Sequence, residues 1–243
     1  MSSPESVQAQ SSAAATAAID LLLQWLGRTI KPDALQWVQD EIRRQRERID
    51  ERRLGMALGL AGRRIGRDAL SLSAADLANA QALRRHWRPD TWRADEAART
   101  ALMLATWTGE EQTFAARVDR LCLTGELTEH VACLKGFAVF PGPAGLLQRA
   151  REAARSSMQP PFEAIACHNP YPADYFDEAA FNQMVVKCVF SGVSIEAVIG
   201  LDERRNDELV RMMRDLISER HAAGRPMPEN VHRWMAGASA AAN

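Results

Sequence analysis

The chain has 243 residues, enough to bury a substantial core as one large domain or two smaller ones. Apolar residues make up 47% and charged residues 25%, which is typical of soluble globular proteins. The net charge of −1 gives no reason to expect nucleic acid or an anionic membrane surface as a partner.

The amino-terminal residues 1–16 are rich in Ser, Ala and Gln, and we expect them to form a disordered tail. They lack the basic cluster of a secretory signal. No segment approaches the roughly 18 uninterrupted apolar residues of a membrane span. The sequence therefore predicts a cytoplasmic protein without a transmembrane segment. Four widely spaced cysteines without a CxxC pair indicate reduced thiols in apolar surroundings: Cys122, Cys133, Cys167 and Cys188.

Residues 17–92 form a predicted amino-terminal helical region. Apolar spacing indicates a helix over Ala18 to Ile30, and Pro32 suits the first turn of the next one. The segment from Leu54 to Gly66 contains four glycines, which predicts a tightly packed or partly irregular stretch. Ser73 is a plausible amino-terminal cap for a further helix.

Residues 93–236 form a predicted helical domain, followed by a second disordered tail at 237–243. Short amphipathic segments alternate here with Gly or Pro punctuation, and no period-two strand pattern is visible. This organisation predicts an all-α fold. Within that class we expect antiparallel helix pairs, arranged as a HEAT-like α-solenoid or as a compact helical array.

The stretch from Pro161 to Gly192 is the most informative part of the chain. It begins with a helical turn or two, and the sequence HNPYP then forces the backbone out of the helix. Asp177 is positioned to cap a second helix that ends at Gly192. That helix is apolar around most of its circumference, so we expect it to be largely buried.

Polar and aromatic residues of this stretch make a candidate ligand-binding site. They offer donors, acceptors and aromatic faces, as a small-molecule pocket requires. The alternative is that they satisfy the backbone of the proline corner or form a narrow solvent-facing strip. The candidate residues are Asn169, Tyr171, Tyr175, Asp177, Asn182, Gln183 and Lys187.

Motifs for catalysis, metal binding and cofactor binding are missing from the sequence. The five histidines fall into no zinc-binding pattern, and no nucleophile-elbow, phosphate-loop or dinucleotide motif occurs. Cys167 and His168 could form a nucleophilic pair, but neighbours in sequence rarely face one substrate. For Asp202, Glu203 and Arg204 a turn held by a local ion pair is the simplest interpretation, and the turn could also help to cap the next helix. We therefore expect no catalytic residue, no metal and no cofactor.

Two long segments carry a family resemblance. They read NPYPADYFDEAAFNQMVVKCVFSGV and GLDERRNDELVRMMRDLISERHAAGRP, and they resemble the EboA family of bacterial proteins. The similarity is close from Arg93 to Trp234 and looser before it, so 93–236 is expected to be an EboA-like helical domain. The resemblance implies a gene cluster with a prenyltransferase, a hydrolase and sugar-phosphate-type enzymes. It also implies a role in moving a secondary metabolite or its precursor from the cytosol to the periplasm, and it supplies no catalytic residues.

Three hypotheses follow for the function. The first is a non-catalytic helical protein that binds or escorts a metabolite or precursor. The second is an interaction scaffold that docks on other proteins of the same cluster through its helical surface. The third is an unrecognised enzyme that uses polar residues of the central stretch.

Overall fold

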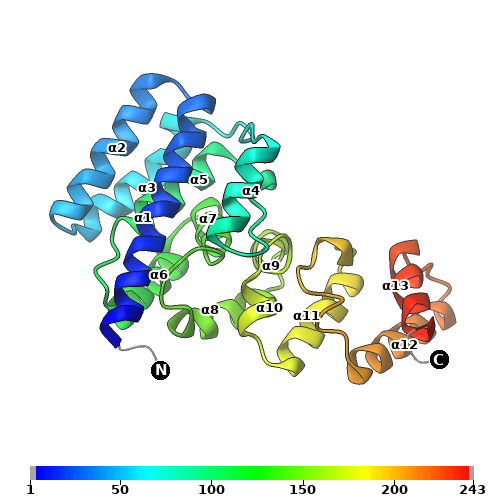
Figure 1. Cartoon of the computed structure of the whole chain (residues 1–243). Coiled ribbons are helices and arrows are strands. Elements are labelled where there is room, and N and C mark those ends of the chain that lie inside the picture. The colour runs from blue at the N-terminus through cyan, green and yellow to red at the C-terminus, as the bar shows by residue number, and fades with distance from the viewer. Residues whose placement is uncertain (1–3, 241–243) are drawn as a thin grey trace.

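A computed structural model of the chain describes residues 4–240 and confirms the all-α fold (Figure 1). Among these residues there are thirteen α-helices, two short 3₁₀ helices and no strand, with one isolated bridge between Ala69 and Arg93. The helices are α1 (Pro4–Thr29), α2 (Pro32–Glu47), α3 (Glu51–Ile65), α4 (Ala74–Leu83), α5 (Ala94–Leu104), α6 (Glu111–Thr124), α7 (Leu127–Gly136), α8 (Pro143–Arg155), α9 (Gln159–Ala166), α10 (Tyr171–Tyr175), α11 (Glu178–Phe190), α12 (Asp207–Ala222) and α13 (Glu229–Ala240). The 3₁₀ helices are η1 (Pro89–Thr91) and η2 (Ile195–Ala197).

Both predicted tails differ from the structure where it describes them. Residues 4–16 belong to α1, because an Ala-rich run has high helix propensity and Ala15 and Ala18 pack into the core. The Trp107 Nε1–H also donates to Ser12 Oγ at 3.1 Å. At the other end, residues 237–240 continue α13. The remaining tail positions, 1–3 and 241–243, lie outside the described residues.

The glycine-rich stretch is also a regular helix, so of the two predicted alternatives, a tightly packed or a partly irregular segment, the second is wrong. Asp50 caps α3 by accepting from the Arg53 N–H at 3.0 Å, and Gly66 ends the helix. Two of the glycines let charged groups approach the helix closely. A Cβ at Gly59 would lie 3.4 Å from Glu129 Oε1, and one at Gly62 would lie 3.5 Å from Arg99 Nη2.

Helix α5 lies at the centre of the protein and is buried along its whole length. Its small residues, such as Ala97 and Ala101, allow α1, α2, α3 and α7 to approach it closely. In Figure 1, α5 lies within the group of helices that contains α1, α3 and α7. The predicted division at residue 92 stays a prediction, and α5 packs directly on helices from before it.

From α7 onward the chain extends away from this centre. Helix α7 packs on α9, and α11 packs on α8, α9 and α12. In Figure 1, α11, α12 and α13 project to one side of the group around α5. The HEAT-like arrangement stays a prediction within the all-α class. No described helix combines the length and apolar character that crossing a membrane would require.

Candidate functional site at the proline corner

The corner between α9 and α11 is held by internal hydrogen bonds of Asn169 and Tyr171. The buried Asn169 amide donates to the backbone oxygens of Leu134 at 3.0 Å and Ala164 at 3.1 Å. Its Oδ1 accepts from the Tyr171 N–H at 3.1 Å, and the Tyr171 hydroxyl donates to the Pro143 oxygen at 2.5 Å. These polar groups therefore satisfy the backbone of the corner.

Asn182 and Lys187 also bind protein groups. Asn182 exchanges two side-chain hydrogen bonds with Asn206, each 3.0 Å long. Lys187 Nζ donates to the oxygens of Ala154 at 3.1 Å and Ser156 at 2.5 Å, and it lies 4.4 Å from the Phe162 ring centroid. Burial lowers the pKa of Lys187 below its ordinary value.

The remaining candidates are more exposed. Tyr175 stacks on Tyr171 with centroids 4.8 Å apart, and Gln183 faces solvent. Asp177 caps α11 by accepting from the Ala180 N–H at 2.8 Å and pairs with Arg151 at 2.5 Å.

The seven candidates do not converge on one cavity. Gln183 and Lys187 alone among them line a small hollow of about 100 Å³, beside Arg151 and Phe176. The assignment of the seven as ligand-binding residues stays a prediction.

Arg204 is a structural residue of the corner. The sequence predicted a local ion pair for it. Its Nη1 donates to three backbone oxygens at the end of α10: Pro172 and Ala173 at 3.0 Å and Phe176 at 2.8 Å. Its guanidinium also lies 4.5 Å from the Phe181 ring centroid. Asp202 instead accepts from Trp234 Nε1 at 2.9 Å. The prediction of a local ion pair is therefore wrong, because carbonyls at the end of a short helix attract the guanidinium.

A larger hollow, which we call the His168 hollow, lies beside Cys167 and His168 of the same corner. It has a volume of about 430 Å³ and lies between α7, α9 and the segment that contains η2. Sequence reasoning missed it because its walls come from separate parts of the chain. Its lining residues are Thr91, Val131, Lys135, Pro160, Glu163, Ala164, Cys167, His168, Gly192, Val193, Ser194 and Ala197.

His168 and Cys167 present neutral polar groups to this hollow. The backbone of His168 is left-handed, with φ of 54°, and its N–H donates to the Ala197 oxygen at 2.7 Å. Burial lowers the pKa of His168, so its imidazole is neutral near pH 7 and can both donate and accept. Burial raises the pKa of Cys167 to about 12, so its sulfur stays a protonated thiol.

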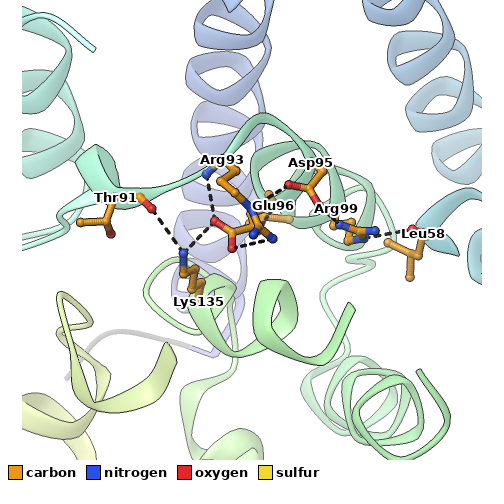
Figure 2. Close-up of polar contacts among 8 residues, drawn as sticks. Leu58, Thr91, Arg93, Asp95, Glu96, Arg99 and Lys135 are labelled. Carbon is orange, nitrogen blue, oxygen red and sulfur yellow. Dashed lines mark hydrogen bonds and ion pairs between the residues drawn. The ribbon is translucent and has the colours of Figure 1, made fainter. Parts of the chain in front are cut away.

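Lys135 connects the His168 hollow to a buried charge network on α5 (Figure 2). Its Nζ donates to Glu96 Oε2 at 2.7 Å and to the Thr91 oxygen at 3.4 Å. Arg93 pairs with both Glu96 and Asp95, and the buried Arg99 donates to Asp95 at 2.5 Å and to the Leu58 oxygen at 3.0 Å. Figure 2 shows these cationic side chains around the carboxylates of Asp95 and Glu96. Of the three cations, Lys135 also lines the His168 hollow.

A second hollow of about 410 Å³ lies beyond η2, between the GLDER turn and α13. His86 lines it, and His86 also has a left-handed backbone, with φ of 64°. His86 and His168 are the described non-glycine residues with positive φ. Histidine tolerates this region better than most side chains, and each of the two lines one of the large hollows.

Comparison with known proteins settles the family. Residues 18–236 match the family described as metabolite traffic protein EboA. The chain belongs to the EboA family. The match covers both the predicted amino-terminal region and the predicted EboA-like domain, so the similarity extends further than the stretch from Arg93 to Trp234. No curated protein and no solved structure matches this EboA-family chain. The description of the family names metabolite traffic, which agrees with the general role that the resemblance implied.

Proposed function

We propose that this EboA-family protein binds a metabolite or its precursor in the His168 hollow and escorts it from the cytoplasm towards the periplasm without converting it. The observation that supports this is the size and lining of the hollow. Its volume of about 430 Å³ falls within the range of about 300–1,000 Å³ typical of small-molecule sites. Other proteins of the same gene cluster are the expected donors and acceptors of the cargo.

The lining favours a partly apolar molecule that carries an anionic or hydrogen-bond-accepting group. Val131, Val193 and Pro160 supply apolar surface. Lys135 supplies a positive charge at one wall, and it brings the cations of the network to three against two carboxylates, an excess of one positive charge. An anionic group beside Lys135 would offset this excess in a medium of low polarity. Glu163 and His168 can accept hydrogen bonds from hydroxyl groups of the same ligand.

The state of Cys167 supports binding over covalent chemistry. A cysteine nucleophile reacts as the thiolate, and the raised pKa of Cys167 disfavours that form. The lowered pKa of the adjacent His168 leaves it neutral, without the charge that would stabilise a thiolate.

Docking on a partner protein is the second candidate, and one exposed side chain favours it. Phe190 at the end of α11 is 68% exposed. It lies two residues before Gly192, which lines the His168 hollow. A partner that covers Phe190 would therefore contact the chain close to a residue of the hollow's wall.

The proposal is tested by filling the hollow. Ala197→Leu adds three carbon atoms at its wall and keeps the backbone oxygen that accepts from His168. Ala179→Leu adds the same atoms on an exposed position of α11 and serves as the matched control. The wild type and both variants are purified from the native host, and small molecules released from each are compared by mass spectrometry.

We expect the wild type and Ala179→Leu to release the same compound and Ala197→Leu to lose most of it. Gln183→Ala tests, in the same assay, the small hollow that Gln183 and Lys187 line. Loss of the compound from Gln183→Ala with retention by Ala197→Leu would move the site to α11. If no compound is released and a partner protein accompanies all forms except Phe190→Ser, the docking function replaces the binding function.

A further inference from the structure

Cys122 on α6 and Cys133 on α7 place their sulfur atoms in contact. Their Sγ atoms lie 3.5 Å apart, at hydrogen-bonding distance for sulfur, and both cysteines are free. The two helices pack against each other and are joined by Gly125 and Glu126. The sequence predicted these residues as separate core thiols, and only the pairing of α6 with α7 brings them together.

The separation of the two sulfurs is short enough for a disulfide to form with a small local movement. A disulfide has an S–S length of about 2.05 Å, so the sulfurs would need to approach by roughly 1.5 Å. Side-chain rotation and a small shift of neighbouring helices can supply such a movement. No described residue separates the two sulfurs, because they already contact each other directly.

Charged and polar neighbours make Cys122 the more acidic thiol. A hydrogen bond from the Cys133 thiol lowers the pKa of Cys122, and His130 and Arg149 lower it further. The same interaction raises the pKa of Cys133, which remains the protonated partner. The other two thiols differ, because burial raises the pKa of both Cys167 and Cys188 to about 12. A thiolate with a protonated thiol beside it is the arrangement of an attacking and a resolving cysteine.

Both cysteines are nearly buried. Cys122 is 6% exposed and Cys133 is 5% exposed, and Leu123 beside Cys122 is 66% exposed on the surface of α6. A small local opening of α6 would admit a peroxide to the sulfurs more readily than a bulky alkylating reagent. The site therefore selects for a small oxidant.

We propose that Cys122 and Cys133 are a redox-active pair that a peroxide converts into an intramolecular disulfide. The Cys122 thiolate attacks one oxygen of hydrogen peroxide and the O–O bond breaks. The other oxygen leaves as hydroxide, which takes up a proton to become water, and Cys122 becomes a sulfenic acid. Cys133 then loses its proton, its sulfur bonds to the sulfur of Cys122, and the hydroxyl of the sulfenic acid leaves as water. Overall the two thiols lose two protons and two electrons, and hydrogen peroxide is reduced to two molecules of water.

The disulfide would act on the helix that lines the His168 hollow. Val131 and Lys135 lie one helical turn apart on α7 and line that hollow, whereas Cys133 lies between them in sequence and faces α6. Drawing Cys133 towards α6 would therefore shift the wall that carries Lys135. The redox chemistry of the pair itself does not depend on the proposed binding function.

The experiment treats the reduced full-length protein with hydrogen peroxide at increasing ratios and follows it by intact mass and by non-reducing peptide mapping. We expect the first product to have lost two hydrogen atoms and to contain the Cys122–Cys133 crosslink, which dithiothreitol reverses. Cys133→Ser should instead gain oxygen at Cys122, because it lacks the resolving thiol. Cys167→Ser is the matched control and should form the crosslink at the rate of the wild type.

Two results would overturn the proposal. One is oxidation of Cys167 or Cys188 before Cys122 in the wild type. The other is gain of oxygen at Cys122 without a crosslink although Cys133 is intact. Far-ultraviolet circular dichroism of each variant, with Cys133→Ala as a second replacement, ensures that a folded protein is compared in every case.

Discussion

Asn182 on α11 and Asn206 at the start of α12 each donate a side-chain hydrogen bond to the other, with Nδ2–Oδ1 distances of 3.0 Å in each direction. Asn206 Oδ1 also accepts from the Leu209 N–H at 2.8 Å and so caps α12. One pair of amides therefore joins the helix of the central stretch to the last long helix. Asn182, which the sequence suggested as part of a ligand-binding site, therefore connects these two helices.

Removal of the Asn182 amide should destabilise the protein. Asn182→Ala removes both hydrogen bonds to Asn206, which keeps its bonds to Arg204 O and Leu209 N. It also opens a small cavity at a position that is 1% exposed. We expect a loss of about 1–3 kcal/mol in the free energy of unfolding. Gln183→Ala, on the exposed side of the same helix, should change it by less than about 0.5 kcal/mol. Urea denaturation compares the two, and equal losses would show that the amide pair contributes little.

Arg204 should contribute more than its position in a turn suggests. Arg204→Met removes hydrogen bonds to three carbonyls and the contact with the Phe181 ring. We expect a loss of about 2–4 kcal/mol. Arg211→Met is the control, because Arg211 pairs with Glu208 and Asp215 at the exposed surface of α12. That change should leave the stability almost unchanged, because exposed ion pairs are screened by solvent, and thermal denaturation distinguishes these outcomes.

Gly200 and Gly192 offer a matched comparison of backbone strain and steric clash. Both have φ of 76°, so alanine is strained to a similar extent at either position. A Cβ at Gly200 would lie 2.7 Å from the Ala173 Cβ, whereas one at Gly192 would meet nothing within 4 Å. We expect Gly192→Ala to cost about 1–2 kcal/mol from strain alone. Gly200→Ala should cost roughly 1–3 kcal/mol more from the clash, and equal losses in urea denaturation would contradict this.

The stability of the protein should depend on the protonation of His168 between mildly acidic and neutral pH. Burial lowers its folded pKa; Asp90 opposes this shift, and Arg88 and Lys135 add to it. The unfolded state therefore binds more protons than the folded state in the window between the folded pKa and the ordinary value near 6.5. Stability is greatest above this window and falls as pH decreases through it.

His168→Asn should flatten this pH dependence, since asparagine tolerates the left-handed backbone and does not titrate. His221→Asn, at an exposed position of α12, should leave the dependence unchanged. Urea denaturation at a series of pH values from about 5 to 8 compares the three proteins. The same slope in His168→Asn and the wild type would assign the dependence to another group.

Local signals in the sequence determined the helices and many of their ends. Asp177, Ser194 and Asn206 each cap a helix by accepting from a backbone N–H two or three residues onward, an interaction that needs no tertiary contact. The same local reasoning did not decide α3. Its glycines were compatible with a tightly packed or a partly irregular segment, and in the structure they allow Arg99 and Glu129 to approach a regular helix.

Only the tertiary structure decided which polar groups face one another. Asn182 contacts Asn206, which lies 24 residues further along the chain. Arg204 binds the end of α10, and the packing of α6 on α7 brings Cys122 into contact with Cys133. The His168 hollow likewise requires walls from α7, α9 and the η2 segment. Helical periodicity indicates which face of a helix is buried. It cannot indicate which other helix covers that face, because that depends on packing between residues distant in sequence.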